Sequence, residues 1–128
     1  MIRTPVATWL NRLSKASDLV AACVARLSDE WAPEDPPVTV IAAEIGHTLV
    51  VRSSEFSDAQ LRDIFLAVED VLTIGTESDK DAVATGLLEA VLAAGDEHPA
   101  QRARALSFAG PESRAYCRAW DSFTGSSG

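Results

Sequence analysis

Apolar residues recur every three or four positions along most of this chain, a spacing that predicts amphipathic helices rather than strands. The first such stripe runs from Val6 to Leu27 and on toward Trp31. Thr4-Pro5 precedes it as an N-cap residue followed by a proline at the first helical position. The pattern leaves open whether Ser14 to Ser17 divides this stripe into two helices.

Residues 38–52 fit two interpretations. Residues 38–41 and 48–51 have the composition of two strands with Gly46 near the turn between them. A helix is also possible, because one helical face would collect Val38, Ile41, Ala42, Ile45 and Leu49. We predict a helix, since two short strands without a third partner are only marginally stable.

The second half of the chain carries clearer helix boundaries. Ser57 and Gln60 form a capping box before a stripe that ends at Gly75, and a further helix is predicted from Ser78 to Gly95. Shorter helices are predicted from Pro99 and from residues 110–112 onward. The sequence therefore predicts an all-α fold, a compact bundle or short stack of about six antiparallel helices. We expect a single domain over residues 1–125 and a flexible tail over residues 126–128.

Charge is distributed unevenly along the chain. Residues 29–97 contain 16 acidic and three basic residues, whereas both flanking segments are mildly basic and the whole chain has a net charge of −8. A field of this sign attracts a cationic partner and disfavours nucleic acid, whose binding depends on cationic contacts to phosphate.

Composition also bears on the cellular compartment. No apolar run approaches the roughly 18 residues of a membrane span, and the Met1 end lacks the apolar stretch of a signal peptide. We therefore expect a cytoplasmic protein without membrane contact. Cys23 and Cys117 are too few for a disulfide framework, so reduced, buried thiols are expected.

Residues that would carry chemistry are sparse. His47 and His98 belong to no metal-ligand spacing, no Gly-rich phosphate loop is present, and Cys117 lies on an apolar helix face. We therefore expect no enzyme activity, no cofactor and no metal. Glu69 and Glu89 lie among apolar residues, and we expect such carboxylates to bind a neighbouring helix end.

With no enzyme activity expected, binding of a protein partner is the function that the sequence favours. Several carboxylates lie near the starts of predicted helices, and we expect them to gather at one end of the bundle, where they would steer a basic partner. Trp31 is a candidate aromatic anchor of the same interface, although it could instead cap the core end of the first helix. The predicted partner-binding residues are Trp31, Glu44, Glu55, Asp58, Asp63, Glu77, Asp79 and Asp81.

Three segments carry a resemblance to known proteins: residues 65–72, residues 84–91 and, most distinctively, the C-terminal cassette of residues 110–121. From about Pro37 to Gly125 the chain resembles small all-helical bacterial proteins, some of which look like immunity proteins of polymorphic-toxin systems. The resemblance implies a helical fold and toxin neutralisation, and it supplies no catalytic residue.

The cassette also has a purely structural interpretation. Arg114 and Arg118 share a helix face and could reach carboxylates of the acidic middle of the chain, residues 29–97. Tyr116, Trp120 and Phe123 form a stripe that would dock the last helix on the core.

The leading hypothesis is a non-enzymatic inhibitor that uses an acidic face to occlude a basic toxin domain, such as a nuclease. The main alternative is a helical adaptor that binds its partner through an apolar groove. A carboxylate-bound metal enzyme is a third and weaker hypothesis.

Overall fold

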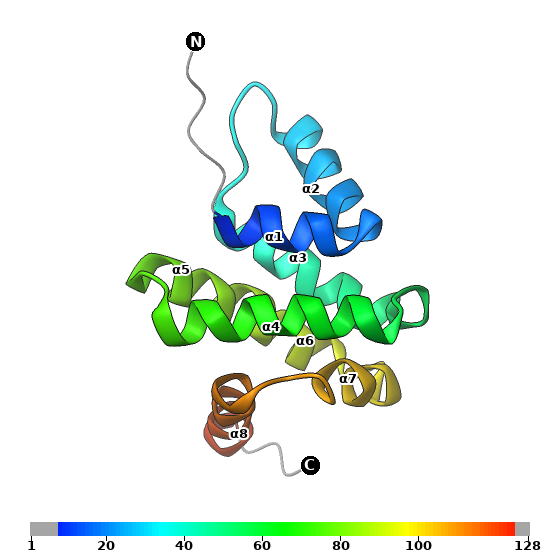
Figure 1. The fold of residues 1–128 in the computed structure, drawn as a ribbon, viewed down its shortest axis with the longest axis vertical. Helices are drawn as coiled ribbons and strands as arrows, with labels where there is room; N and C mark the ends of the chain where they lie inside the picture. Colours follow the sequence, from blue (N-terminus) through cyan, green and yellow to red (C-terminus); the bar gives the residue numbers. More distant parts are fainter. Residues whose placement is uncertain (1–7, 125–128) are drawn as a thin grey trace.

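The computed structural model describes the backbone of residues 8–124 and the side chains of residues 8–122, and this part of the chain forms helices and no strands (Figure 1). The fold is all-α, as predicted. The predicted cap at Thr4-Pro5, the tail over residues 126–128 and the side chain of Phe123 lie outside the described residues. The elements are α1 (Thr8–Ala16), α2 (Asp18–Trp31), α3 (Val38–Val51), η1 (Ser53–Glu55), α4 (Asp58–Ile74), α5 (Glu77–Asp81), η2 (Ala82–Leu88), α6 (Glu89–Ala94), α7 (Pro99–Leu106) and α8 (Pro111–Thr124).

The first apolar stripe forms two helices, because the chain breaks at Ser17. This residue is extended, with φ −155° and ψ 131°, and its hydroxyl accepts hydrogen bonds from the amides of Leu19 (3.1 Å) and Val20 (3.4 Å). A serine in this conformation is a favoured N-cap, since it satisfies amides that have no partner within the helix. If α5, η2 and α6 are counted as one helix and the short η1 is left out, the described residues form seven helices, in keeping with the prediction of about six.

The segment from α5 through α6 is one continuous helix. Ala82 and Glu89, at the two junctions, both have right-handed helical backbone angles. Residues 82–88 between them form a π-helical stretch, which is wider than an α-helix and uncommon within one. Together with α4, which is followed by its C-cap Gly75, this helix forms an antiparallel pair (Figure 1).

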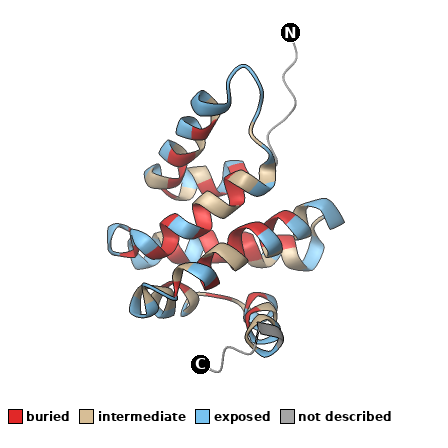
Figure 2. Ribbon diagram, turned by 180° about the vertical axis from the view of Figure 1, so that it is seen from behind, coloured by how far each residue is buried: buried red, intermediate tan, exposed pale blue. Residues whose placement is uncertain are grey.

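The ambiguous segment at 38–51 is the helix α3, as predicted. It lies in the middle of the molecule and is the element most surrounded by others, packing against α2, η2, α6 and α7 (Figure 2). It buries residues on several sides and not on one stripe, which explains why its hydrophobic pattern also resembled strands. Its buried residues are Ile41, Ala42, Ile45, Gly46, Thr48, Leu49 and Val50.

Two glycines allow α3 and η2 to cross at unusually close range. A Cβ atom on Gly46 would lie 2.2 Å from the carbonyl oxygen of Leu87, closer than such atoms can approach. A Cβ atom on Gly86 would lie 2.8 Å from the Cβ of Ala42 and 3.0 Å from the carbonyl oxygen of Thr39. Backbone therefore packs against backbone, and no larger residue fits at either position.

The helix α4 provides the base on which α1 and α8 pack. It begins with the predicted capping box: the Ser57 hydroxyl accepts from the Gln60 amide (3.1 Å), and the Ser57 amide donates to the Gln60 side chain (2.9 Å). Its inner face carries Leu61, Ile64, Phe65, Val68 and Val71 into the core. Among the described helices, none is long and apolar enough to cross a bilayer.

We predict that Gly46→Ala and Gly86→Ala each destabilise the fold by about 3 kcal/mol, because the added methyl group overpacks the crossing. Helix propensity alone would give the opposite sign, since alanine stabilises a helix by about 1 kcal/mol relative to glycine. Urea unfolding measures the difference. Thr85→Ser, at an exposed position of η2, keeps the hydroxyl that donates to the carbonyl oxygen of Asp81 (2.6 Å), so it is the control and should change the stability by less than about 0.5 kcal/mol. Unchanged stability of both glycine variants would contradict the close crossing.

Candidate functional site

The predicted acidic residues do not gather at one end of the molecule, so that prediction is wrong. Asp58 begins α4, whereas Glu77, Asp79 and Asp81 lie in α5, beyond the other end of α4. Because α4 has 17 residues, its two ends are about 25 Å apart. The carboxylates are near one another in sequence, but a long helix separates them in space.

Four of the seven predicted carboxylates are also engaged in ion pairs. The pairs are Glu44 with Arg26 (3.0 Å), Glu55 with Arg52 (2.6 Å), Asp58 with Arg104 (3.0 Å) and Glu77 with Lys80 (3.6 Å). The hydrogen bonds from Arg52 lower the pKa of the Glu55 carboxyl. Exposed pairs of this kind add little stability, but each cancels part of the negative field that would attract a partner. No ion pair between described residues includes Asp63, Asp79 or Asp81.

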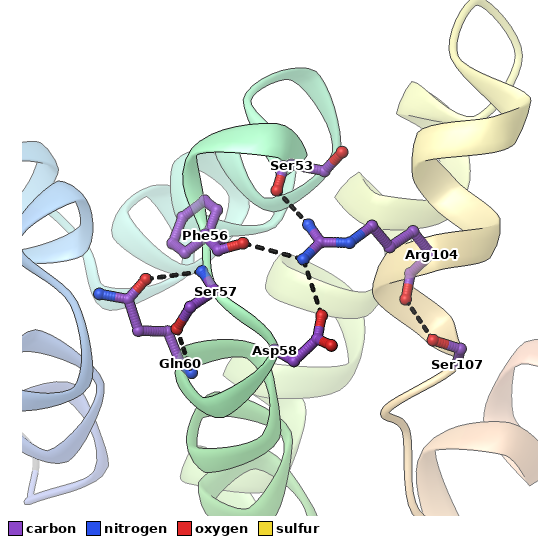
Figure 3. A network of polar contacts seen from close by, with 7 residues as sticks. All are labelled: Ser53, Phe56, Ser57, Asp58, Gln60, Arg104 and Ser107. Carbon is purple, nitrogen blue, oxygen red and sulfur yellow. Dashed lines mark hydrogen bonds and ion pairs between the residues drawn. The ribbon is translucent and has the colours of Figure 1, made fainter.

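Asp58 belongs to a structural network around Arg104 (Figure 3). The Arg104 guanidinium donates to the carbonyl oxygen of Phe56 (2.9 Å), to the Asp58 carboxylate (3.0 Å) and to the carbonyl oxygen of Ser53. One side chain from α7 thereby satisfies two carbonyl groups in the turn between α3 and α4. Asp58 helps to orient Arg104, and this structural role explains the position of Asp58 without a binding partner.

The end of α2 forms an acidic tip with an exposed tryptophan. We call residues 29–35 the acidic tip: they comprise Asp29, Glu30, Trp31, Ala32, Pro33, Glu34 and Asp35, with no basic residue among them. Trp31 is 39% exposed, so it does not cap the core. This end of α2 and the loop after it lie at the far side of the molecule from α7 and α8 (Figure 1). Neighbouring Arg26 pairs with Glu30 at 2.7 Å.

A groove runs along α3 beside α6 and the start of α7. It has a volume of about 630 Å³ and is lined by the small residues Ala43, Ala90, Ala93 and Ala94 and by the polar residues Glu44, His47, Asp96, Glu97 and His98. Both histidines of the chain therefore line one groove, although they looked unrelated in the sequence. No local pattern could reveal this, because the fold brings together positions 51 residues apart. Among the described residues, no group of three or more His, Cys, Asp or Glu side chains is arranged to hold a metal ion.

A second hollow, of about 370 Å³, places Cys23 near Glu44 and His47. A cysteine and a histidine in one hollow invite comparison with a nucleophile and its base. Here burial and, secondarily, the Glu44 carboxylate raise the pKa of the Cys23 thiol. Burial likewise raises the pKa of Cys117. Reactive cysteines have lowered pKa values, so neither environment activates its thiol.

Glu69 binds the start of α8, as predicted for a carboxylate in its position. Its two oxygens accept hydrogen bonds from the backbone amides of Glu112 (2.7 Å) and Ser113 (3.2 Å) and from the Ser113 hydroxyl (3.2 Å). The amides at a helix N-terminus have no partner within the helix and favour a negative charge. A Cβ atom on Gly110 would lie 2.6 Å from this carboxylate, which explains the glycine before Pro111.

The remaining cassette residues also serve the fold. The prediction that Glu89 binds a neighbouring helix end is wrong, because its carboxylate instead accepts a hydrogen bond from the hydroxyl of Tyr116 within α8. Burial and, secondarily, this bond raise the pKa of the tyrosine. Arg114 does not reach the acidic middle: it donates to the carbonyl oxygens of Ala109 (2.7 Å) and Ser107 (3.2 Å), because these unpaired carbonyls after α7 lie closer. The contacts of Glu69, Tyr116 and Arg114 fix α8 on the body of the protein.

No protein-family model, curated protein or solved structure matches the chain.

We predict that Glu69→Gln destabilises the protein by about 1–3 kcal/mol. The glutamine side chain lacks the negative charge and the second acceptor oxygen that the backbone N–H groups at the start of α8 require. Thermal unfolding gives the magnitude, and hydrogen exchange of the first-turn amides of α8 gives the location. Glu97→Gln, which changes the charge equally at an exposed position, should shift the stability by less than about 0.5 kcal/mol. Equal effects of the two substitutions would contradict the role of Glu69.

We also predict that both thiols react slowly with a disulfide reagent such as DTNB in the native protein, since both are buried and protonated. The rate should rise at least a hundredfold in urea at the same pH. Rapid modification of either thiol under native conditions would contradict this assignment.

Proposed function

We propose that this chain is a non-enzymatic protein-binding module, an immunity-type inhibitor that neutralises a basic toxin domain in the cytoplasm. The observation that carries the proposal is the acidic tip, where Trp31 is exposed among four carboxylates at the end of α2 and in the loop that follows it. The toxin-inhibitor assignment also draws on the resemblance of residues 37–125 to small all-helical bacterial proteins, some of which look like immunity proteins.

The acidic tip combines the two features that mark an interface. A tryptophan supplies a large apolar surface, and residues of this type dominate the free energy of many protein interfaces. The carboxylates around it raise the rate of encounter with a positively charged partner and discriminate against other partners. Since Trp31 ends a helix, its backbone is held in place before the partner arrives.

A basic, nucleic-acid-cleaving toxin fits this chemistry. The groove of such an enzyme is lined with cations that bind phosphates, and an acidic protein can occupy it in place of the nucleic acid. The inhibitor then needs no catalytic residue, only a surface of complementary shape and opposite sign.

The second candidate is a helical adaptor that binds through the groove along α3. The observation that favours it is the alanine floor of that groove, which gives a neighbouring helix room for close approach. In that case the carboxylates would serve solubility, and binding would depend little on salt.

Two charge-matched variants distinguish these surfaces in a pull-down from the host. Asp29→Lys with Glu34→Lys alters the acidic tip, and Glu77→Lys with Asp81→Lys alters the α5 end by the same net charge. We expect the tip variant to weaken binding of a basic partner at least tenfold and the α5 variant by less than threefold. Association of the parent protein should slow as salt rises.

Trp31→Ala tests the anchor and should also cost at least tenfold in affinity, with the far-ultraviolet spectrum unchanged because the side chain lies outside the core. The retained partner, once purified, should lose its activity at a stoichiometric amount of this protein. Loss of binding in the α5 variant alone would move the interface to α5. Binding that ignores salt and both charge variants would support the adaptor.

A further inference from the structure

The outer face of α4 has a symmetric pattern of residues. Ala59, Arg62, Leu66, Asp70 and Thr73 are all exposed, and their spacings of 3, 4, 4 and 3 place them on one stripe of the helix. The spacing reads the same in both directions from Leu66. Figure 1 shows this helix lying across the front of the molecule with no element before it.

The chemistry of this stripe is complementary to itself. If a second α4 lay antiparallel on the first with Leu66 at the twofold axis, Leu66 would meet its own copy. Arg62 would face Asp70 of the partner subunit, and the reverse pair would form by symmetry. Ala59 would face Thr73 of the partner subunit, so both ends of the contact carry small side chains.

The observation that favours this pairing is that Arg62 has no ion-pair partner among the described residues. The acidic middle of the chain contains only three basic residues. Arg52 pairs with Glu55 at 2.6 Å and Lys80 with Glu77 at 3.6 Å, but no hydrogen bond or ion pair between described residues includes Arg62. This cation lies on the helix face that also exposes Leu66, which is 52% accessible.

Asp70 has a carboxylate oxygen that can accept a hydrogen bond from Arg62 of the partner subunit. Arg12 binds only the Oδ2 atom of Asp70, at 2.6 Å, and no described residue bonds its Oδ1 atom. Thr73 turns its hydroxyl back to the carbonyl oxygens of Glu69 (3.0 Å) and Asp70 (3.2 Å), so it brings no unpaired donor into the contact.

We propose that the outer face of α4 is a homodimer interface, in which Leu66 packs on its copy and Arg62 pairs with Asp70 of the partner subunit. Because the area of one helix pair is small, we expect a weak dimer with a dissociation constant of about 10–100 μM. The net charge of −8 per chain opposes association at low salt, and about 0.15 M salt screens this repulsion beyond roughly 8 Å. The acidic tip is not part of this face.

Sedimentation velocity of the full chain from about 10 μM to 1 mM tests the proposal. The parent protein should dimerise over this range, and Leu66→Glu should remain monomeric. Arg62→Asp opposes two aspartates across the axis, and Asp70→Arg opposes two arginines, so each should weaken the dimer at least tenfold.

Mixing the two charge variants is the decisive step. In an equimolar mixture the aspartate introduced at position 62 of one chain would face the arginine introduced at position 70 of the other. The unaltered Asp70 and Arg62 of the same two chains would also face each other, so a heterodimer should form within about threefold of the parental affinity. Arg118→Asp and Asp81→Arg make the same charge changes on other exposed positions and should leave the dimer unaffected.

Circular dichroism identifies any variant that fails to fold. If Asp70→Arg is such a variant, Leu66→Glu and Arg62→Asp still measure the loss of the dimer. A parent protein that is monomeric at 1 mM would overturn the proposal. So would a dimer that Leu66→Glu leaves intact, or a mixture of folded Arg62→Asp and Asp70→Arg chains that does not associate.

Discussion

The fold depends on the crossing of α3 with the helix that runs through η2. Gly46 and Gly86 remove side chains from this crossing, and the carbonyl oxygen of Leu87 lies where a Cβ atom would otherwise be. Such proximity lets α3 bury residues toward α2, α6 and α7 at the same time. Dispersion contacts weaken steeply with distance, so a wider crossing would loosen the packing of every helix that touches α3. The π-helical stretch lies on the same segment and sets which residues face α3.

Most of the named polar contacts serve helix ends. Ser17, Ser57 and Thr76 cap the starts of their helices, Glu69 caps α8 from a distance, and Arg104 satisfies carbonyl groups in the turn after α3. Short helices have a high proportion of backbone groups without partners, so a protein built from them needs many such contacts. This use of polar residues explains why Asp58 and Glu69 are placed as they are.

The features that depend on the local spacing of residues, such as helices and their starts, were predicted well from the sequence. The stripe through Val38, Ile41 and Ile45 predicted a helix at α3, and Ser57 with Gln60 predicted the start of α4. The break at Ser17 stayed open, because a serine suits both an N-cap and the polar face of a longer helix. For Glu69 the kind of partner was predictable, but its identity required the fold, since 43 residues separate it from Glu112. The prediction of a single acidic cluster was wrong, because the 17 residues of α4 place carboxylates that are close in sequence far apart in space.

The acidic tip is nearly independent of the core, and this separation has an evolutionary consequence. Trp31 and the loop after it are exposed, whereas the residues that hold the helices together lie around Gly46 and at the start of α8. Substitutions in the tip therefore change the stability of the protein very little. A lineage can accumulate such changes without passing through unfolded intermediates, so the surface chemistry of the tip can diverge while the architecture stays constant.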